Sequence, residues 1–449
     1  MAFVREQFER PQSWGQDWKH SHSVIPSKSW GKPNQQSGIT TGNDPRHLIV
    51  CAENPGGLPS LAKLAEQAPN LGLRWIGTLG EELRRAGVNN SSTADELKHR
   101  FAILEILEGS EATALQKLFR LECSLRRDDN LEKFVAAEGD YPLHYSIPTK
   151  IGANYGLTAG TSKHGVYSGM LEVQKAHNKG VKGKDVMVAV VDSGVEKQGI
   201  ATDFEDLFDF QNKGETDRNG HGTAMTSIVQ DIAPEATITS IRVSDGFPRM
   251  WKIMGGVAAA SFEHQADIIN ISMGLNIPGT CSQCGMSSPG LSTILETFLS
   301  DISQYAVGSN GPPLLVASTG NDNQPEFTCP AKWNFMVAVG AINASKARSR
   351  FSNYGDSGHS AFFVMPGGDD DDQENPLEWV GKGDDGECLG TSPATAYASG
   401  MLALYYSDSD YRQSDRQQFL TDVLAKCDDT FSGYDKDQHG KGLLPYVEK

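Results

Sequence analysis

Hydrophobic positions fall into two regions of the chain that differ in their pattern. In the first region, short apolar runs alternate with segments whose apolar residues lie three and four positions apart, as on one face of a helix. The predicted order is strand, helix, strand, strand, helix, strand, at 48–53, 58–67, 73–79, 101–107, 110–121 and 132–140. This order is the split β-α-β arrangement of a small α+β, ferredoxin-like domain.

In the second region the apolar runs are continuous rather than alternating, and helical segments lie between them. Strands are predicted at 186–191, 236–243, 266–274, 313–318 and 335–341, and helices at 168–180, 221–230, 291–303 and 392–407. Strands that are apolar on both faces and alternate with helices are typical of a parallel sheet covered on both sides. We therefore expect an α/β domain of three layers.

These patterns divide the chain into a flexible N-terminal arm, the small α+β domain, a connector and the α/β domain, at 1–45, 46–145, 146–165 and 166–449. The arm has no helical or strand periodicity, which is typical of a segment without a packed core. It repeats Ser-Trp-Gly at 13–15 and 29–31. Because exposed tryptophan is typical of binding surfaces, a docking partner for the arm is one hypothesis.

Charge and hydropathy exclude two classes of partner. The 449 residues include 40 Lys and Arg against 57 Asp and Glu, a net charge of −17, whereas proteins that bind nucleic acid through its phosphates need clustered basic residues. Nucleic acid is therefore not an expected partner. No apolar run approaches the roughly 20 residues that span a bilayer, so no membrane partner is expected either. The first 25 residues are charged and lack the apolar stretch of a secretory signal, so we expect a cytoplasmic protein.

Seven cysteines, an odd number in a long chain, favour reduced thiols over a disulfide framework. Cys281 and Cys284 form a single CxxC pair. A zinc site of this type needs a second ligand pair at similar spacing, and none follows. We interpret the two as loop thiols and expect no metal, with a metal-binding or redox role as the alternative.

Three residues of the second region could act together in catalysis. Asp192 ends a predicted buried strand, whereas His221 and Ser392 each begin a predicted helix. In a parallel sheet these positions meet at the carboxyl edge of the strands. A serine hydroxyl becomes a good nucleophile when an imidazole takes its proton and a carboxylate orients that imidazole. Each residue alone also fits a structural role, as a turn cap or a helix start.

Taken together, order and motifs resemble the subtilisin-like serine peptidases, the subtilase family. The matching segments are VVDSG at Asp192, GHGT at His221, INISMG at 269–274, ASTGN ending at Asn321, and GTS at Ser392. The resemblance extends from about residue 167 to the end of the chain. It implies a subtilisin-like fold in which Asp192 is the orienting carboxylate, His221 the general base, Ser392 the nucleophile and Asn321 the oxyanion donor.

The same resemblance implies a substrate and where it binds. The substrate is an extended polypeptide whose backbone pairs with two segments of the cleft, and one further residue lies at the floor of the primary specificity pocket. The residues implied are Ser272, Met273, Gly274, Ser318, Thr319, Gly320 and Thr328. Pro393 and Ala396-Tyr397 depart from the usual family residues behind the nucleophile, which we expect catalysis to tolerate. The acyl-transfer chemistry itself requires no cofactor. The short helix after His221 leaves no room for a common calcium loop, so calcium is possible but is not predicted.

Two segments keep more than one interpretation. The acidic segment 369–387 is read as a solvated loop, with a cation site or an electrostatic rim for basic substrates as alternatives. The domain at 46–145 resembles the inhibitory propeptide of subtilases, which predicts a zymogen that cuts itself near Tyr145. An unrelated regulatory domain is the alternative.

The resulting hypothesis is an intracellular serine endopeptidase. A peptide ligase or macrocyclase would use the same acyl-enzyme, and a peptide-binding module without catalysis is the third class.

Overall fold

The fold was taken from a computed structural model. It describes residues 46–52, 58–87, 97, 99–128, 134–141, 143–145, 164–195, 206–209, 217, 219–244, 248–275, 279–280, 287–288, 292–304, 311–355, 358–369, 388–413 and 415–449. The predicted arm at 1–45, most of the connector, Cys281, Cys284 and all but Asp369 of the acidic segment lie outside these residues. Their interpretations stay predictions, as do the domain boundaries next to them.

The N-terminal region forms a four-stranded antiparallel sheet with helices. Its elements are β1 (His47–Ala52), α1 (Leu58–Gln67), η3 (Ala68–Leu71), β2 (Leu73–Thr78), α2 (Leu79–Arg85), β3 (Phe101–Ile106), α4 (Glu111–Asp128) and β4 (Phe134–Gly139). The strand order is β2-β3-β1-β4, with antiparallel pairs throughout. Apolar residues of β1, α1, β3 and α4 form one buried cluster, including Val50, Leu64, Leu104 and Leu118. The expected small α+β domain is confirmed.

Helix α2 was not predicted, although the sequence contains a signal for it. The Thr78 hydroxyl accepts a hydrogen bond from the Glu81 amide at 3.3 Å, and the Glu81 carboxylate accepts one from the Thr78 amide at 2.8 Å. This reciprocal capping box satisfies two backbone donors that a helix start otherwise leaves unpaired. It ends β2 at Thr78 and begins α2 at the next residue.

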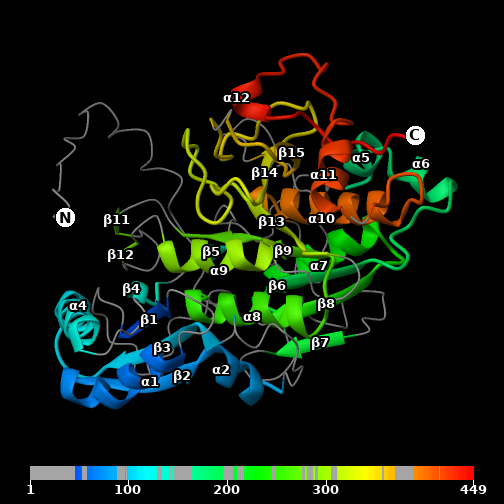
Figure 1. The fold of residues 1–449 in the computed structure, drawn as a ribbon. Helices are drawn as coiled ribbons and strands as arrows, with labels where there is room; N and C mark the ends of the chain where they lie inside the picture. Colours follow the sequence, from blue (N-terminus) through cyan, green and yellow to red (C-terminus); the bar gives the residue numbers. More distant parts are fainter. Residues whose placement is uncertain are drawn as a thin grey trace, which may run out of the picture. The chain divides into compact units, whose positions relative to one another are not determined.

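The second region contains a seven-stranded parallel sheet between two helical layers (Figure 1). Its strands, in the order β15-β14-β13-β9-β6-β8-β7, are Phe362–Pro366, Val337–Ile342, Leu314–Ser318, Ile268–Ile271, Met187–Asp192, Thr237–Arg242 and Asp206–Asp209. Helices α8 (Met250–Phe262) and α9 (Thr293–Gln304) cover one face, and α7 (His221–Ile232) and α10 (Thr391–Ser407) cover the other. The predicted three-layer α/β architecture is confirmed.

The remaining elements are short or peripheral. They are α5 (His164–Met170), α6 (Val173–Asn178), α11 (Arg416–Leu424), α12 (Lys436–His439), and the two-residue strands β5 (His144–Tyr145), β10 (Met273–Gly274), β11 (Gly279–Thr280) and β12 (Ser287–Ser288). The helix predicted at 168–180 is two helices, because Glu172 between them adopts a left-handed φ of 58°. The strand predicted at 266–274 likewise divides into β9 and β10 around Ser272.

The N-terminal domain contacts α8 and α9 through acidic residues at the end of β4. The Glu138 carboxylate accepts hydrogen bonds from the Ser292 hydroxyl and the Ile294 amide at the start of α9. The Asp140 carboxylate accepts one from the Trp251 amide at the start of α8, at 2.9 Å. Each helix start therefore receives a carboxylate, which its unpaired amides and dipole favour.

The chain after β4 continues onto the α/β domain. Strand β5 pairs with β10 in antiparallel register, with Tyr145 opposite Met273 and His144 opposite Gly274. Ion pairs of Arg100 with Asp301 and of Lys252 with Glu82 also join the two domains.

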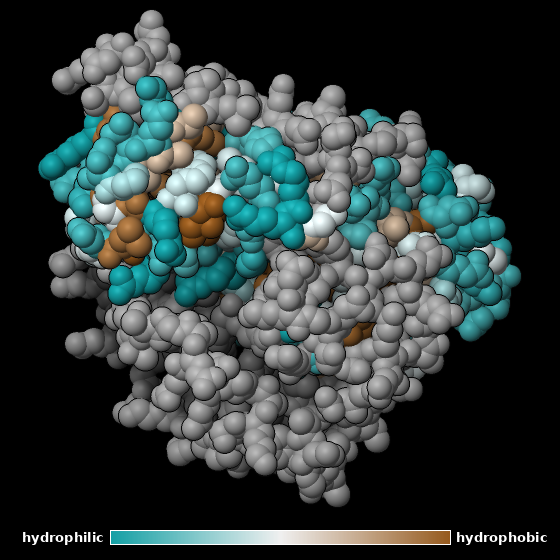
Figure 2. All heavy atoms as spheres, turned by 90° about the horizontal axis from the view of Figure 1, so that it is seen from below, coloured by the Kyte–Doolittle hydropathy of each residue, from teal (hydrophilic) through white to brown (hydrophobic). Residues whose placement is uncertain are grey.

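The described surface seen from below in Figure 2 is mostly hydrophilic, with hydrophobic side chains in small groups. Within the described ranges, every helix is too short or too polar to cross a bilayer.

Candidate active site

The carboxyl ends of the central strands carry the residues that the sequence singled out. Asp192 is the last residue of β6, and His221 is the first residue of α7. His221 Nδ1 and Asp192 Oδ1 are 2.7 Å apart, and both side chains have no exposed surface. The Ser193 amide also donates to Asp192 Oδ1, at 2.7 Å. A buried carboxylate so close to Nδ1 fixes the orientation of the ring and favours a proton on that nitrogen.

The start of α7 fits against the turn after β6 only because residue 222 is a glycine. A Cβ atom at Gly222 would lie 2.2 Å from the carbonyl oxygen of Gly194. Any side chain would therefore push His221 away from the strand end that carries Asp192. The Asp192–His221 contact thus requires the glycine that follows the histidine in the GHGT motif.

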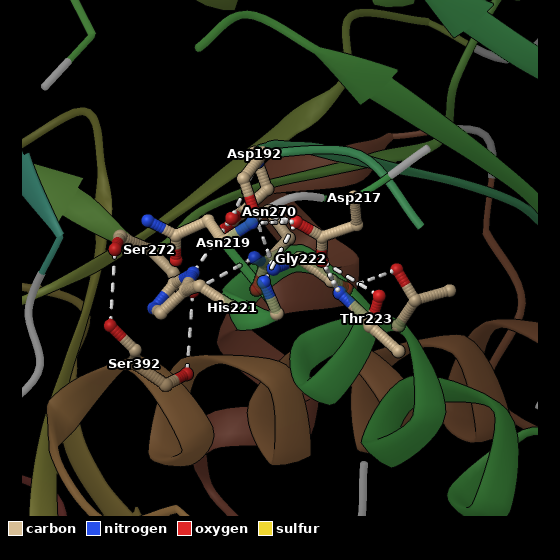
Figure 3. A network of polar contacts seen from close by, with 12 residues as sticks. Asp192, Asp217, Asn219, His221, Gly222, Thr223, Asn270, Ser272 and Ser392 are labelled. Carbon is tan, nitrogen blue, oxygen red and sulfur yellow. Dashed lines mark hydrogen bonds and ion pairs between the residues drawn. The ribbon is translucent and has the colours of Figure 1, made fainter. Parts of the chain in front are cut away.

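Ser392 lies in the first turn of α10 and is fully buried. Its hydroxyl donates to the Ser272 carbonyl oxygen at 3.0 Å, and the Ser272 hydroxyl donates to the Ser392 carbonyl at 3.3 Å. Asn270 in β9 donates a hydrogen bond to the Ser272 hydroxyl at 2.9 Å. It also accepts one from the Ser399 hydroxyl, which lies two turns after Ser392 in α10. Figure 3 shows His221 between Asp192 and Ser392, with Ser272 beside the serine. The structure therefore brings the three predicted residues to one place.

Asn321 follows β13 and faces the same helix start. Its Oδ1 atom accepts hydrogen bonds from the Thr391 amide at 3.0 Å and the Thr391 hydroxyl at 2.9 Å. These two donors fix which way the side-chain amide points. The Nδ2 atom of Asn321 is buried, and none of the described residues accepts a hydrogen bond from it. A buried N–H without an acceptor is costly, so a site that holds one is suited to an oxygen supplied by a ligand.

The predicted substrate-binding residues lie around this point. Met273 and Gly274 form β10, which already pairs with β5. Ser318 and Thr319 are fully buried, and the Thr319 carbonyl accepts from the Thr328 amide and hydroxyl at 2.9 and 3.2 Å. The segment 318–320 is therefore bonded within the protein and suits a cleft wall, whereas β10 offers a pairing edge.

The Thr328 side chain fills the space between the two segments. A Cβ atom at Gly274 would lie 2.6 Å from Thr328 Oγ1, and one at Gly320 would lie 2.8 Å from Thr328 Cγ2. Thr328 is 8% exposed. Thr328 therefore leaves no room for a side chain at either Gly274 or Gly320.

One buried thiol, Cys329, lies next to Thr328 in sequence. Burial raises the pKa of the Cys329 thiol to about 12, so it is protonated and unreactive at neutral pH. The cysteines Cys51, Cys329, Cys388 and Cys427 are free thiols. No group of three or more His, Cys, Asp or Glu side chains in the described part of the chain is arranged to hold a metal ion.

Comparison with known proteins agrees with this geometry. The sequence model described as "Subtilase family" matches residues 183–430, more than half of the chain. The chain belongs to the subtilase family. The fold of the second region is accordingly subtilisin-like. The relatives described next are named as proteases.

Two relatives and one solved structure show how similar this chain is to known proteins. The Major intracellular serine protease of Bacillus subtilis (strain 168) is 29% identical over 276 residues, which cover 55% of this chain and 77% of that protein. The Minor extracellular protease Epr of the same organism is 29% identical over 294 residues, covering 62% of this chain but 40% of that protein. Among solved structures, the one titled "Structure of Prenylagaramide maturation protease PagA" aligns with a TM-score of 0.47 and 24% identity, covering 61% of this chain and 94% of that one.

Sequence reasoning missed two buried residues that form hydrogen bonds within this site, Asn270 and Asp217. Asn270 was part of a quoted motif, but its contacts to Ser272 and Ser399 come from elements far apart in sequence. Asp217 precedes His221 by four residues and gave no pattern signal, because a single Asp in a polar loop is usually solvated.

Proposed function

We propose that this subtilase is a serine endopeptidase that cleaves extended polypeptides. Ser392 Oγ attacks the carbonyl carbon of the scissile bond, and His221 Nε2 accepts its proton. Asp192, fixed 2.7 Å from Nδ1, stabilises the imidazolium that forms. His221 then gives the proton to the leaving amine, and water releases the acyl group by the same route in reverse.

The buried amide of Asn321 carries this proposal beyond family membership. The tetrahedral intermediate places negative charge on an oxygen, and a fixed N–H directed at that oxygen lowers the barrier. Asn321 Nδ2 is buried, unpartnered among the described residues, and held in one orientation by Thr391. The amide of Ser392, at the start of a 17-residue helix, is the proposed second donor.

The substrate backbone is proposed to add a strand beside Met273 and Gly274. These residues already accept an antiparallel partner, β5, from the chain itself. Ser272, Ser318, Thr319 and Gly320 would line the same cleft, and Thr328 would favour small side chains next to the scissile bond. The proposed reaction uses no metal and no cofactor.

Labelling by a fluorophosphonate probe, together with mass spectrometry of products from defined peptides, tests the proposed activity. Wild type should bind one probe at Ser392 and yield shorter peptides, whereas Ser392→Ala should do neither. Ligated or cyclic products without hydrolysis would instead favour the ligase alternative. A wild type that neither reacts nor cleaves would leave only peptide binding.

We further propose that residues 46–145 are an inhibitory propeptide and that the chain is a zymogen. Two observations support this: Glu138 and Asp140 are docked on α9 and α8, and β5 occupies the edge at β10. Tyr145 lies opposite Met273. Met273 directly follows Ser272, whose carbonyl oxygen accepts a hydrogen bond from the Ser392 hydroxyl. Self-cleavage is therefore expected close to Tyr145.

Gel electrophoresis and N-terminal sequencing of the large fragment test the zymogen proposal. Wild type should separate into two fragments with the new terminus within a few residues of Tyr145, and Ser392→Ala should stay intact. The released N-terminal domain should inhibit in trans. An active wild type that is never cut would favour a regulatory domain of other origin.

We propose a cytoplasmic location for this enzyme, supported by the free thiols of Cys51, Cys329, Cys388 and Cys427. Cell fractionation with an antibody against the α/β domain would test it.

A further inference from the structure

Asp217 is a buried carboxylate that accepts hydrogen bonds from both sides of the candidate site. Oδ1 accepts from the Ser193 hydroxyl and from the amides of Asn219 and Gly220, each at 2.9 Å. Oδ2 accepts from the Thr223 amide at 2.8 Å and the Thr223 hydroxyl at 2.7 Å. Asp217 is 8% exposed, so water does not replace these contacts.

The partners of Asp217 flank the two residues that form the buried pair. Ser193 directly follows Asp192, and Gly220 directly precedes His221. The Ser193 hydroxyl, which donates to Asp217, also accepts from the Gly222 amide at 2.9 Å. His221 is therefore held by a hydrogen bond at the residue on each side, and both bonds lead to Asp217 (Figure 3).

This arrangement makes Asp217 a junction between two elements that also meet through the Asp192–His221 contact and the packing of Gly222 on Gly194. Strand β6 ends at Asp192, and α7 begins at His221 after 28 intervening residues. Charge-assisted hydrogen bonds to a carboxylate are stronger than neutral ones, and a buried network rigidifies its surroundings when every member is satisfied. Removing the carboxylate would leave several buried donors without an acceptor.

We propose that Asp217 is a positioning residue for catalysis, which holds His221 in register with Asp192 and Ser392 through Ser193, Gly220 and the first turn of α7. This inference rests on the proposed peptidase function. Asp217 itself takes no part in proton transfer, because both of its oxygens are occupied by donors of the loop and helix start.

The test compares Asp217→Ala, Asp217→Asn and Ser193→Ala with wild type, all produced as full-length chains and assayed at the same extent of cleavage near Tyr145. The readouts are kcat and KM on a peptide that wild type cleaves, the rate of Ser392 labelling by a fluorophosphonate, and the unfolding temperature. Misplacing a catalytic group by about 1 Å costs roughly 10²-fold. We expect kcat and the labelling rate to fall about 10²-fold for Asp217→Ala and about tenfold for the two milder variants, with KM within about twofold of wild type.

Asp267→Asn is the matched control. Asp267 is 3% exposed, accepts from the Met187 amide at 2.8 Å and pairs with Arg416, but it lies at the opposite end of β6. This variant should lower the unfolding temperature while the folded protein keeps the kcat of wild type. Ser392→Ala, measured alongside, should be inactive and unlabelled.

The outcomes separate the two proposals. A folded Asp217→Ala with the kcat of wild type, or with a change in KM alone, would overturn the positioning role while leaving the peptidase function intact. An equal loss of kcat in Asp267→Asn would also overturn it, because the loss would then reflect general destabilisation. If wild type fails to react with the probe, or Ser392→Ala keeps activity, the peptidase proposal fails and the positioning role fails with it.

Discussion

The active site and the contact between the two domains both place carboxylates at helix starts, but they surround them differently. Asp217 sits before α7 and accepts from five donors, two of them hydroxyls. Glu138 and Asp140 sit before α9 and α8, and burial is the largest influence on both, raising the pKa of each above its ordinary value. At the site the donors come from the same domain, whereas at the contact they come from the other domain.

The difference separates a fixed use of this interaction from a reversible one. Donors on neighbouring residues of the same domain are in place whenever the domain is folded, so the carboxylate of Asp217 gains them without further ordering. Under the proposed zymogen, the carboxylates at the contact must leave water when the N-terminal domain docks, which opposes the hydrogen bonds that they gain. The first arrangement suits the permanent geometry of the proposed catalytic site, and the second suits the proposed removable inhibitor.

The largest effect is expected inside the site. Ser392→Ala and His221→Ala should each lower kcat by roughly 10⁴-fold or more, and the double variant should be hardly worse, because the residues act as a unit. Steady-state hydrolysis of one defined peptide measures this. A double variant much slower than either single variant would show that the two act separately.

Loss of Asn321, the proposed oxyanion donor, should have the second largest effect on kcat. Asn321→Ala is expected to lower kcat by about 10²–10³-fold with KM almost unchanged, a magnitude known from subtilisin rather than calculated for this site. Asp322→Ala, at the next and partly exposed position, is the control and should leave kcat near that of wild type, because the backbone amide and carbonyl through which Asp322 contacts Asn353 and Gln324 remain in the variant. A large rise in KM for Asn321→Ala would assign the residue to ground-state binding instead.

At the contact between the two domains, removing a carboxylate should weaken inhibition by the N-terminal domain and leave kcat unchanged. Removing a helix-capping carboxylate costs about 1 kcal/mol, so Asp140→Ala should weaken inhibition by the cleaved N-terminal domain about fivefold. Glu138→Ala should do at least as much, because it leaves the Ser292 hydroxyl and the Ile294 amide without this acceptor. Glu66→Ala, an exposed residue of α1 paired with Lys63, is the control. Equal inhibition by all three variants would show that Glu138 and Asp140 do not contribute to binding of the N-terminal domain.

The burial of each element decides whether the sequence could predict it. Strands β6, β13 and β14 were found because they are buried on both faces and therefore apolar throughout. Helix α8 was missed for a related reason: every residue in it except Lys252 is buried, so it has no polar face and no helical periodicity. The four-residue strand β7 is too short for its pattern to be distinctive.

For the site, local motifs placed Asp192, His221, Ser392 and Asn321 at the strand and helix ends where the structure has them. Their partners Asp217 and Asn270 were not predictable, because hydrogen bonds between distant elements leave no periodic signal in sequence. The contacts of Asn353 with the loop after Asn321 belong to the same class.

The smallest expected effect is a pH dependence confined to the contact between the domains. Burial raises the pKa of Glu138 and of Asp140 in the docked domain, whereas in the released domain both return to the ordinary carboxyl range. Docking therefore takes up protons, so its contribution is fully present below the ordinary carboxyl range and is lost as pH rises through the raised values. Inhibition by the cleaved domain should weaken with rising pH over that interval.

The change should be at most about tenfold per pH unit for each carboxylate, and smaller where only part of the population titrates. Inhibition measured from acidic to neutral pH, relative to the enzyme without its N-terminal domain, checks this. The double variant Glu138→Gln with Asp140→Asn should flatten the profile, because the amides keep an acceptor oxygen but do not titrate. His47 also acts electrostatically on Asp140, so His47→Gln serves as the control for that interaction. Inhibition that strengthens with rising pH would show that the hydrogen bonds at α8 and α9, and not the loss of water, dominate this contact.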